Sequence, residues 1–193
     1  MVETKTEDSA QPQEPAETKP AKRRPPKRKL VEEHARSAFD ALTRRDAQGI
    51  GEHYREDCVV DIVPIGVFRG RQAIVDFFLE VFAAVPDLET TVTRVVAGET
   101  QAAVEWRMRG HHTGEPFQGI DPTGRQVELR GLDLLEIEDG ETVSNTAYYD
   151  GAAFARQVGM LPPQDSGAER TMKTAFNTVT KVRKAVAERT GGG

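Results

Sequence analysis

The stretch Arg125–Ile137, RQVELRGLDLLEI, alternates between two kinds of side chain along its length. A period of two with one apolar set predicts a long β-strand that buries one of its faces. The apolar set contains a single acid, and most of the opposite set is polar or charged. The apolar set is Val127, Leu129, Gly131, Asp133, Leu135 and Ile137, and the opposite set includes Gln126, Glu128, Arg130 and Glu136.

Asp133 is therefore expected to point into an apolar environment. A carboxylate in such a place is costly unless it is hydrogen-bonded, paired or protonated. We expect Asp133 to have either a structural partner or a chemical role. Gly131, two residues earlier on the same face, indicates open space or a bulge beside it.

Neighbouring segments extend the predicted sheet on both sides of this strand. Gln101–His112 alternates in the same way and places Trp106, Met108 and His112 on one face. Thr142–Asp150 follows the turn dipeptide Asp139-Gly140 and is rich in β-branched and aromatic residues, which is typical of an antiparallel strand. The Gly- and Pro-containing segment Thr113–Gly124 between two strands is predicted to be a loop that serves as a lid.

The N-terminal half is predicted to be mainly helical. Apolar residues at helical spacing predict helices over Leu30–Arg45 and Arg71–Ala84, the second with Phe78 in its buried stripe, and Asp46 can cap a short helix between them. Cys58–Ile62 and Leu88–Ala97 have strand character. We expect an α+β fold in which a cone-shaped, curved antiparallel sheet wraps around three N-terminal helices.

The composition favours one folded domain with a tail at each end. Residues 1–28 are polar and Pro-rich and are expected to be disordered, residues 29–163 to form the domain, and residues 164–193 to contain an amphipathic helix with a flexible end. No apolar run reaches the roughly 20 residues of a membrane-spanning helix, and no secretory signal is present, so we expect a cytoplasmic protein. The single cysteine, Cys58, is expected to be a small buried hydrophobe.

Charge and motif spacing exclude several functions for the folded part. Residues 30–164 carry 12 basic and 23 acidic side chains, and this excess of acid disfavours nucleic-acid binding. His34 and His53 belong to helices and form no metal-ligand cluster of a recognised spacing. The sequence also contains no phosphate-binding loop and no Cys/His nucleophile pair.

Six short motifs within Leu30–Leu161 resemble those of the SnoaL-like polyketide (ester) cyclase family. This family has the cone-shaped α+β fold of ketosteroid isomerase, scytalone dehydratase and nuclear transport factor 2. The family's last strand often carries an acid and a histidine or aromatic residue, where this chain has Asn145, Thr146 and Ala147. The motifs that carry the resemblance are Val67–Arg71, Phe82–Leu88, Gly110–Gly114, Pro122–Arg125, Gly131–Asp133 and Tyr148–Gly151.

The resemblance implies a site of acid and base groups facing one cavity. Compared with ketosteroid isomerase, Asp61 falls at the position of the proton-abstracting carboxylate and Asp133 at that of a protonated acid that donates to the substrate oxyanion. Compared with the cyclases, Asp133 and His112 would form a pair that moves the proton of an activated carbon during intramolecular aldol closure, without metal or organic cofactor. The expected cavity wall comprises Phe78, Trp106, Met108, Leu129, Leu135, Tyr148 and Tyr149.

Two classes of function follow from these observations. The first is a cofactor-free cyclase or isomerase that binds a hydrophobic carbonyl compound and acts through Asp133, His112 and Asp61. The second is a non-catalytic ligand-binding or protein-interaction module that is tethered through its basic N-terminal tail and its C-terminal helix. For either class, the resemblance implies a homodimer formed through the outer face of the sheet.

Overall fold

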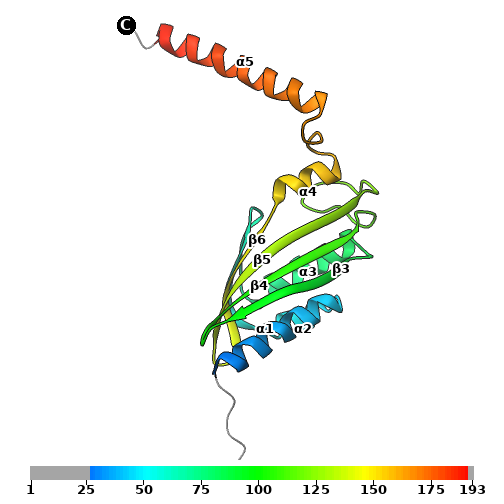
Figure 1. Cartoon of the computed structure of the whole chain (residues 1–193), viewed down its shortest axis with the longest axis vertical. Helices are drawn as coiled ribbons and strands as arrows, with labels where there is room; N and C mark the ends of the chain where they lie inside the picture. Colours follow the sequence, from blue (N-terminus) through cyan, green and yellow to red (C-terminus); the bar gives the residue numbers. More distant parts are fainter. Residues whose placement is uncertain (1–26, 191–193) are drawn as a thin grey trace, which may run out of the picture.

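A computed structural model describes residues 27–190 of the chain (Figure 1). The helices and strands follow the predicted order, with the first strand longer than expected because it begins before Cys58. They are α1 (Lys27–Thr43), α2 (Ala47–Gly51), β1 (Tyr54–Val63), β2 (Gly66–Arg69), α3 (Arg71–Ala84), β3 (Glu89–Ala97), β4 (Gln101–His111), β5 (Gln126–Glu138), β6 (Glu141–Tyr149), α4 (Gly151–Val158) and α5 (Gly167–Thr190).

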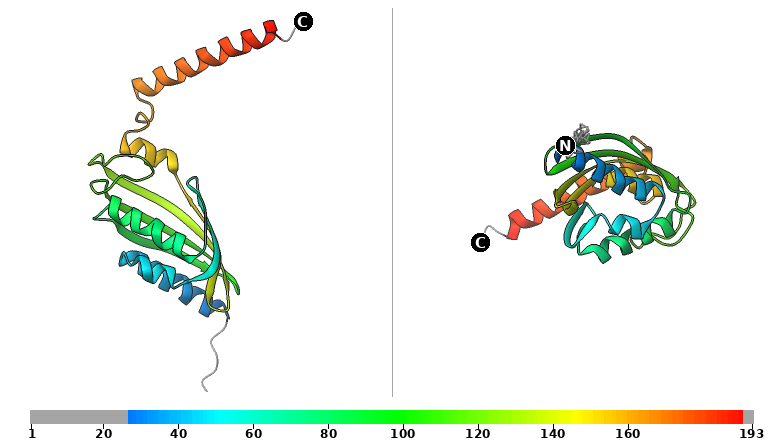
Figure 2. Two further views of the ribbon diagram at one scale, coloured as in Figure 1. Left: turned by 180° about the vertical axis from the view of Figure 1, so that it is seen from behind. Right: turned by 90° about the horizontal axis from the view of Figure 1, so that it is seen from below.

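The six strands form one curved sheet in the order β2-β1-β6-β5-β4-β3. Helices α1 and α3 lie against its concave side, α2 packs against both of them, and no helix within residues 27–190 covers the opposite face (Figure 2). The predicted fold class is thereby confirmed. One pair departs from the antiparallel rule, because β1 runs parallel to β6 and all the other neighbouring strands run antiparallel.

Burial along β5 follows the predicted alternation. Asp133, Leu135 and Ile137 are buried on the inner face, whereas Leu132 and Leu134 lie on the outer face and remain 42% and 43% exposed. The inner face packs against α1 and α3, whose apolar stripes form the other wall of the core. The hydrophobic effect is the main driving force for this packing.

Side-chain caps fix the two short helices that flank the sheet. The Asp46 carboxylate accepts a hydrogen bond from the backbone N–H of Gly49 at 2.9 Å, as its predicted capping role requires. Asp150 does the same for α4 by accepting from the N–H of Ala153 at 2.8 Å. Because α4 follows β6 directly, this cap aims α4 across the open end of the cone.

The N-terminal boundary of the domain differs from the expected one. Lys27 and Arg28, predicted to belong to a disordered tail, form the first turn of α1. The rest of that predicted tail, residues 1–26, and the final three glycines lie outside the described residues. Helix α5 projects away from the sheet and its helices (Figures 1 and 2). Within residues 27–190, no helix is both long enough and apolar enough to cross a membrane.

Candidate functional site

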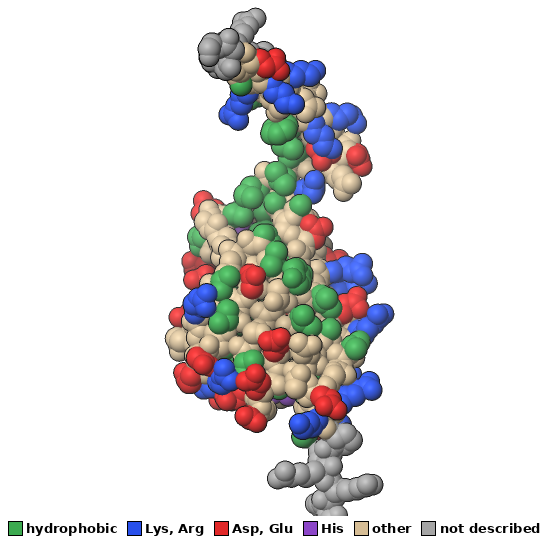
Figure 3. Space-filling model, turned by 90° about the vertical axis from the view of Figure 1, so that its left-hand side faces the viewer, with side chains coloured by type: hydrophobic (Ala, Val, Ile, Leu, Met, Phe, Trp, Pro, Cys, Tyr) green, Lys and Arg blue, Asp and Glu red, His purple; other side chains and the backbone are tan. Residues whose placement is uncertain are grey.

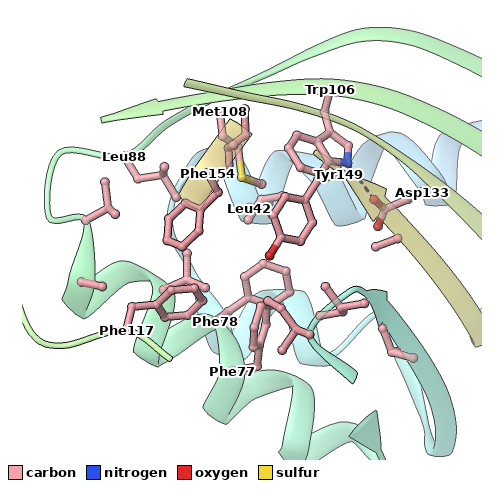
Figure 4. Close-up of a pocket in the computed structure, with 18 of the residues that line it drawn as sticks. Leu42, Phe77, Phe78, Leu88, Trp106, Met108, Phe117, Asp133, Tyr149 and Phe154 are labelled. Carbon is pink, nitrogen blue, oxygen red and sulfur yellow. Dashed lines mark hydrogen bonds between the residues drawn. The ribbon is translucent and has the colours of Figure 1, made fainter. Parts of the chain in front are cut away.

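A cavity lies between the concave face of the sheet and helices α1 and α3 (Figure 4). Apolar side chains make up most of its wall, and eight of the lining residues are aromatic. Such a cavity suits a hydrophobic ligand whose few polar groups are held at specific points. The aromatic residues of the wall are Phe39, Tyr54, Phe77, Phe78, Trp106, Phe117, Tyr149 and Phe154.

Asp133 is the one carboxylate in the wall, and both of its oxygens accept hydrogen bonds. The indole N–H of Trp106 donates to Oδ1 at 2.7 Å (Figure 4), and the amide Nδ2 of Asn145 donates to Oδ2 at 2.7 Å. The residue is only 8% exposed. Asn145 Nδ2 also donates to the hydroxyl oxygen of Tyr54 at 3.1 Å, so strands β1, β4, β5 and β6 each supply one member of a buried polar network.

Gly131 determines the position of the Trp106 ring. The two residues are direct cross-strand partners on β4 and β5. A β-carbon at residue 131 would lie 2.2 Å from Cζ2 of Trp106, which is closer than atoms can approach. The space that the glycine was expected to leave open is therefore filled by the indole, and this placement brings Nε1 within reach of Asp133.

Burial raises the pKa of Asp133 from 3.8 to about 6, although the hydrogen bonds from Asn145 and Trp106 act in the opposite direction. Desolvation dominates because the charged form has lost its hydration. A carboxyl group with this pKa is largely ionised at pH 7 yet close enough to neutrality to hold a proton during a reaction. That property suits a group that must first accept and then return a proton.

Two phenols also reach the cavity wall. Burial, and then the charge of Asp133, raise the pKa of Tyr54, so its hydroxyl keeps its proton. The Tyr54 oxygen accepts a hydrogen bond from Asn145, and its own O–H proton has no acceptor among the described residues. Burial also raises the pKa of the half-buried Tyr149, whose hydroxyl points into the cavity (Figure 4).

Six of the ten predicted site residues line this cavity. The cavity brings Asp133 together with residues expected to form the wall on four different elements. They are Phe78, Trp106, Met108, Leu129, Asp133 and Tyr149.

His112 does not lie beside Asp133, so the predicted pair does not form in this structure. Val104 on β4 is the cross-strand partner of Asp133. His112 follows Val104 by eight residues, which corresponds to about 26 Å at the rise per residue of a strand. His112 is almost fully buried, and neither ring nitrogen has a hydrogen-bond partner among the described residues. Both residues are on the same side of the sheet, but they are far apart along the direction of the strands.

Strand alternation removes two further residues from the wall. Val60 and Ile62 face the cavity, so Asp61 between them faces the outside of the sheet, away from the position expected of a base. Tyr148 and Tyr149 are consecutive and point to opposite faces, which leaves Tyr148 52% exposed. Leu135 is on the inner face as predicted, but it is buried in the core outside the cavity.

Several wall residues have only weak signals in the sequence. Asn145 is a neutral residue on the inner face of β6, and Tyr54 precedes the segment with clear strand character. Phe117 is a large apolar residue in the loop predicted to be a lid, and its ring lies 6.2 Å from that of Phe77 and 6.1 Å from that of Phe154. The loop thus contributes to the wall, while its movement as a lid stays a prediction.

Among residues 27–190, no group of three or more His, Cys, Asp or Glu side chains is placed to hold a metal ion. The buried Cys58 carries a thiol whose pKa is raised, chiefly by burial. Of the acidic and basic side chains that were predicted to act, only Asp133 is in contact with the cavity.

A sequence model of the SnoaL-like polyketide cyclase family matches residues 32–158, which includes every strand and helices α2, α3 and α4. No curated protein matches the chain.

Solved structures of low sequence identity share the fold. A protein from Jannaschia sp. CCS1, described as a candidate SnoaL-like polyketide cyclase, has a TM-score of 0.65 at 20% identity, covering 74% of this chain and 100% of the other. AclR from Streptomyces galilaeus, described as a candidate hydroxylase, has a TM-score of 0.63 at 21% identity, covering 86% and 99%. IdmH from Streptomyces antibioticus, described as a candidate polyketide cyclase, has a TM-score of 0.56 at 24% identity, covering 66% and 96%.

Proposed function

This chain belongs to the SnoaL-like polyketide cyclase family, and we propose that it binds a hydrophobic carbonyl compound in its cavity and moves protons on it through Asp133. The observation that carries this proposal is a buried carboxylate in the wall of an apolar cavity, with a pKa raised to about 6. A perturbed acid in a cleft is a sign of a functional site. The reaction class is cyclisation or isomerisation through an enolate.

One carboxylate is sufficient for the proton transfers of such a reaction. Ionised Asp133 removes a proton from the carbon next to a carbonyl group, and the electron pair of the C–H bond forms the enolate. In a cyclisation, the enolate carbon attacks a second carbonyl group of the same molecule, and the resulting alkoxide takes the proton back from Asp133. In an isomerisation, the proton returns to a different carbon.

The Tyr54 hydroxyl is placed to stabilise the negative charge that develops on oxygen. Its oxygen is held by Asn145 and its O–H proton is free to point at a ligand, within the same network as Asp133. A donor fixed in advance in an apolar cavity stabilises a developing oxyanion strongly.

Exchange of α-protons in the absence of ring closure tests the proposal directly. We expect the protein to accelerate deuterium incorporation into 2-tetralone, a fused two-ring ketone, in deuterated buffer followed by proton NMR. The rate should rise as Asp133 ionises and reach half its maximum near pH 6. The Asp133→Asn variant should show no catalysed exchange at any pH, and catalysis that survives this substitution would assign the base to another group.

The Tyr54→Phe variant should slow exchange by about 100-fold, which is typical for the loss of one oxyanion donor. Because the hydroxyl acts on the transition state, we expect the maximal rate to fall and the ketone concentration at half saturation to change little. Tyr149→Phe is the matched control, since it removes a phenol from the same wall outside the Asp133 network. Equal losses in the two variants would argue against a specific role for Tyr54.

A non-catalytic ligand-binding role gives a different result in the same assay. In that case, 2-tetralone would perturb the NMR signals of cavity residues such as Met108 and Phe117 without catalysed exchange. Binding without exchange in the wild-type protein would therefore replace the enzymatic proposal.

A further inference from the structure

Helix α5 carries an exposed apolar stripe that no other element within residues 27–190 covers. Met172, Phe176, Val179 and Val182 recur at spacings of three or four residues and are 45%, 70%, 50% and 58% exposed. Such spacing places them on one side of a helix. We propose that this stripe of α5 packs against the outer face of the sheet in a second copy of the chain.

The outer face offers a matching apolar surface. Leu132 and Tyr148 are cross-strand neighbours on β5 and β6, Leu134 follows on the same face, and all three are between 42% and 52% exposed. Figure 3 shows hydrophobic side chains on one face of the body and along the side of α5. A contiguous apolar surface of this kind is typical of a protein-binding site.

The positive charge of α5 favours binding to a negatively charged surface, such as the folded domain of another copy. Five basic residues and no acid occur between Glu169 and Glu188, so two α5 helices would repel each other if they met side by side. Residues 30–164 have eleven more acidic than basic side chains. That body is attracted to the basic helix of another copy, and it is repelled by the anionic membrane surface that a basic amphipathic helix can otherwise bind.

The order of apolar and charged residues also sets the direction of the helix on the sheet. The C-terminal half of α5 carries Lys181, Arg183 and Lys184, and the apolar patch on β5 is followed by Glu136 and Glu138. Phe176 and Arg183 are about 10 Å apart along a helix, and Leu134 and Glu138 are about 13 Å apart along a strand. With α5 running in the direction of β5, Phe176 meets the apolar patch and Arg183, on the same side of the helix, meets Glu136 and Glu138, which in their own chain bind Gln101, Ser144 and Arg55.

The start of α5 is fixed so that the helix points away from its own sheet. Arg156 of α4 forms an ion pair with Glu169 at 3.4 Å, and the carboxylate of Glu169 also accepts from the N–H of Asp165 at 2.8 Å. Pro162 and Pro163 stiffen the connection from α4. If each copy places α5 on the sheet of the other, the two copies are related by a two-fold axis. Both apolar surfaces, the stripe of α5 and the outer face of the sheet, are then buried in each copy.

Cross-linking between single substitutions identifies which surfaces meet. The Phe176→Cys and Leu134→Cys proteins, one of them carrying a tag that changes its mass, are mixed and treated with a short bis-maleimide. We expect a covalent dimer of mixed mass in the mixture and little product with either protein alone. The native Cys58 is fully buried, and treating the wild-type protein with the same reagent measures any cross-linking through Cys58.

Each alternative occupant gives its own product and would overturn the proposal. Cross-linking of Phe176→Cys with itself would show that two α5 helices pair, and cross-linking of Leu134→Cys with itself would show that two sheets pack directly. Flotation of the wild-type protein with vesicles of phosphatidylglycerol and phosphatidylcholine, without a mixed covalent dimer, would show that α5 binds a membrane surface.

Analytical ultracentrifugation provides an independent measurement. Phe176→Asp should raise the dissociation constant of the dimer by about 100-fold or more, as expected for an aromatic residue at the centre of an interface. Thr174→Asp introduces the same charge about 160° around the helix and should leave dimerisation unchanged. A monomeric wild-type protein, or equal effects of the two substitutions, would refute the assembly without affecting the exchange assay on Asp133.

Discussion

Replacing Asp133 with asparagine is expected to stabilise the folded protein by about 3 kcal/mol at pH 8 and to change its stability little at pH 3.5. The pKa of the carboxyl is about 6 in the folded state, against 3.8 as its ordinary value. Between these two values the folded state binds the proton more tightly than the unfolded chain. Stability therefore falls as the pH rises through this window, and a neutral amide at residue 133 removes that dependence.

The surroundings of Asp133 can accept an amide with both of its own polar groups hydrogen-bonded. Trp106 Nε1 can still donate to the amide oxygen, and the Oδ1 atom of Asn145 is buried without a partner among the described residues. If the amide of Asn145 inverts, the NH₂ group of the new asparagine donates to that oxygen. The inverted Asn145 then has its own NH₂ group at the buried position where its oxygen had no partner, so the substitution exchanges one unpaired acceptor for one unpaired donor.

Urea denaturation followed by circular dichroism measures the effect at each pH. The difference between variant and wild type isolates residue 133, because all other ionisable groups are common to both proteins. Asp61→Asn is a suitable control for the removal of one carboxylate, since Asp61 lies on the outer face of the sheet. Parallel stability curves for wild type and Asp133→Asn would mean that burial does not shift the pKa of this carboxyl.

The Gly131→Ala variant is expected to lose about 3 kcal/mol of stability, because the new methyl group and the Trp106 ring cannot occupy the same space. Displacing the indole also removes one of the two hydrogen bonds to Asp133. We therefore expect the pKa of Asp133 to rise further in this variant. Carboxyl chemical shifts followed by NMR during a pH titration, together with urea denaturation, test both effects.

Gly98→Ala is the matched control for this substitution. A β-carbon at residue 98 would lie 3.6 Å from the nearest atom, the carbonyl oxygen of Gln101, which is an ordinary contact. Both substitutions add one methyl group at a glycine, and only the first meets a side chain of the site. Equal stabilities of the two variants would show that Trp106 has room to move.

The fold could be predicted largely because strand and helix periods are local properties. The alternation of apolar and polar residues in Arg125–Ile137 predicts a strand with one buried face, and the burial of side chains along β5 follows this alternation. Apolar residues at helical spacing likewise predicted α1 and α3 and the faces that these helices bury. The parallel pairing of β1 with β6 joins segments that are more than 80 residues apart, and no local pattern predicts it.

Predicting the site required the register between strands, which a single sequence does not contain. His112 shares a strand face with Trp106, yet the register of β4 and β5 separates it from Asp133. Assigning both Tyr148 and Tyr149 to the cavity contradicted strand alternation, which allows only one of the two. Asn145 differs from the residues common in the family, and for that reason its hydrogen bond to Asp133 was not expected.

The hydrogen bond between Trp106 and Asp133 also has an optical consequence. The chain contains one tryptophan, so its whole indole emission comes from a ring in direct contact with the carboxylate. Loss of the negative charge beside Nε1 changes the electric field on that ring, and a molecule entering the cavity changes its surroundings. Intrinsic fluorescence of the unlabelled protein should therefore report proton uptake and ligand entry at the same atom pair.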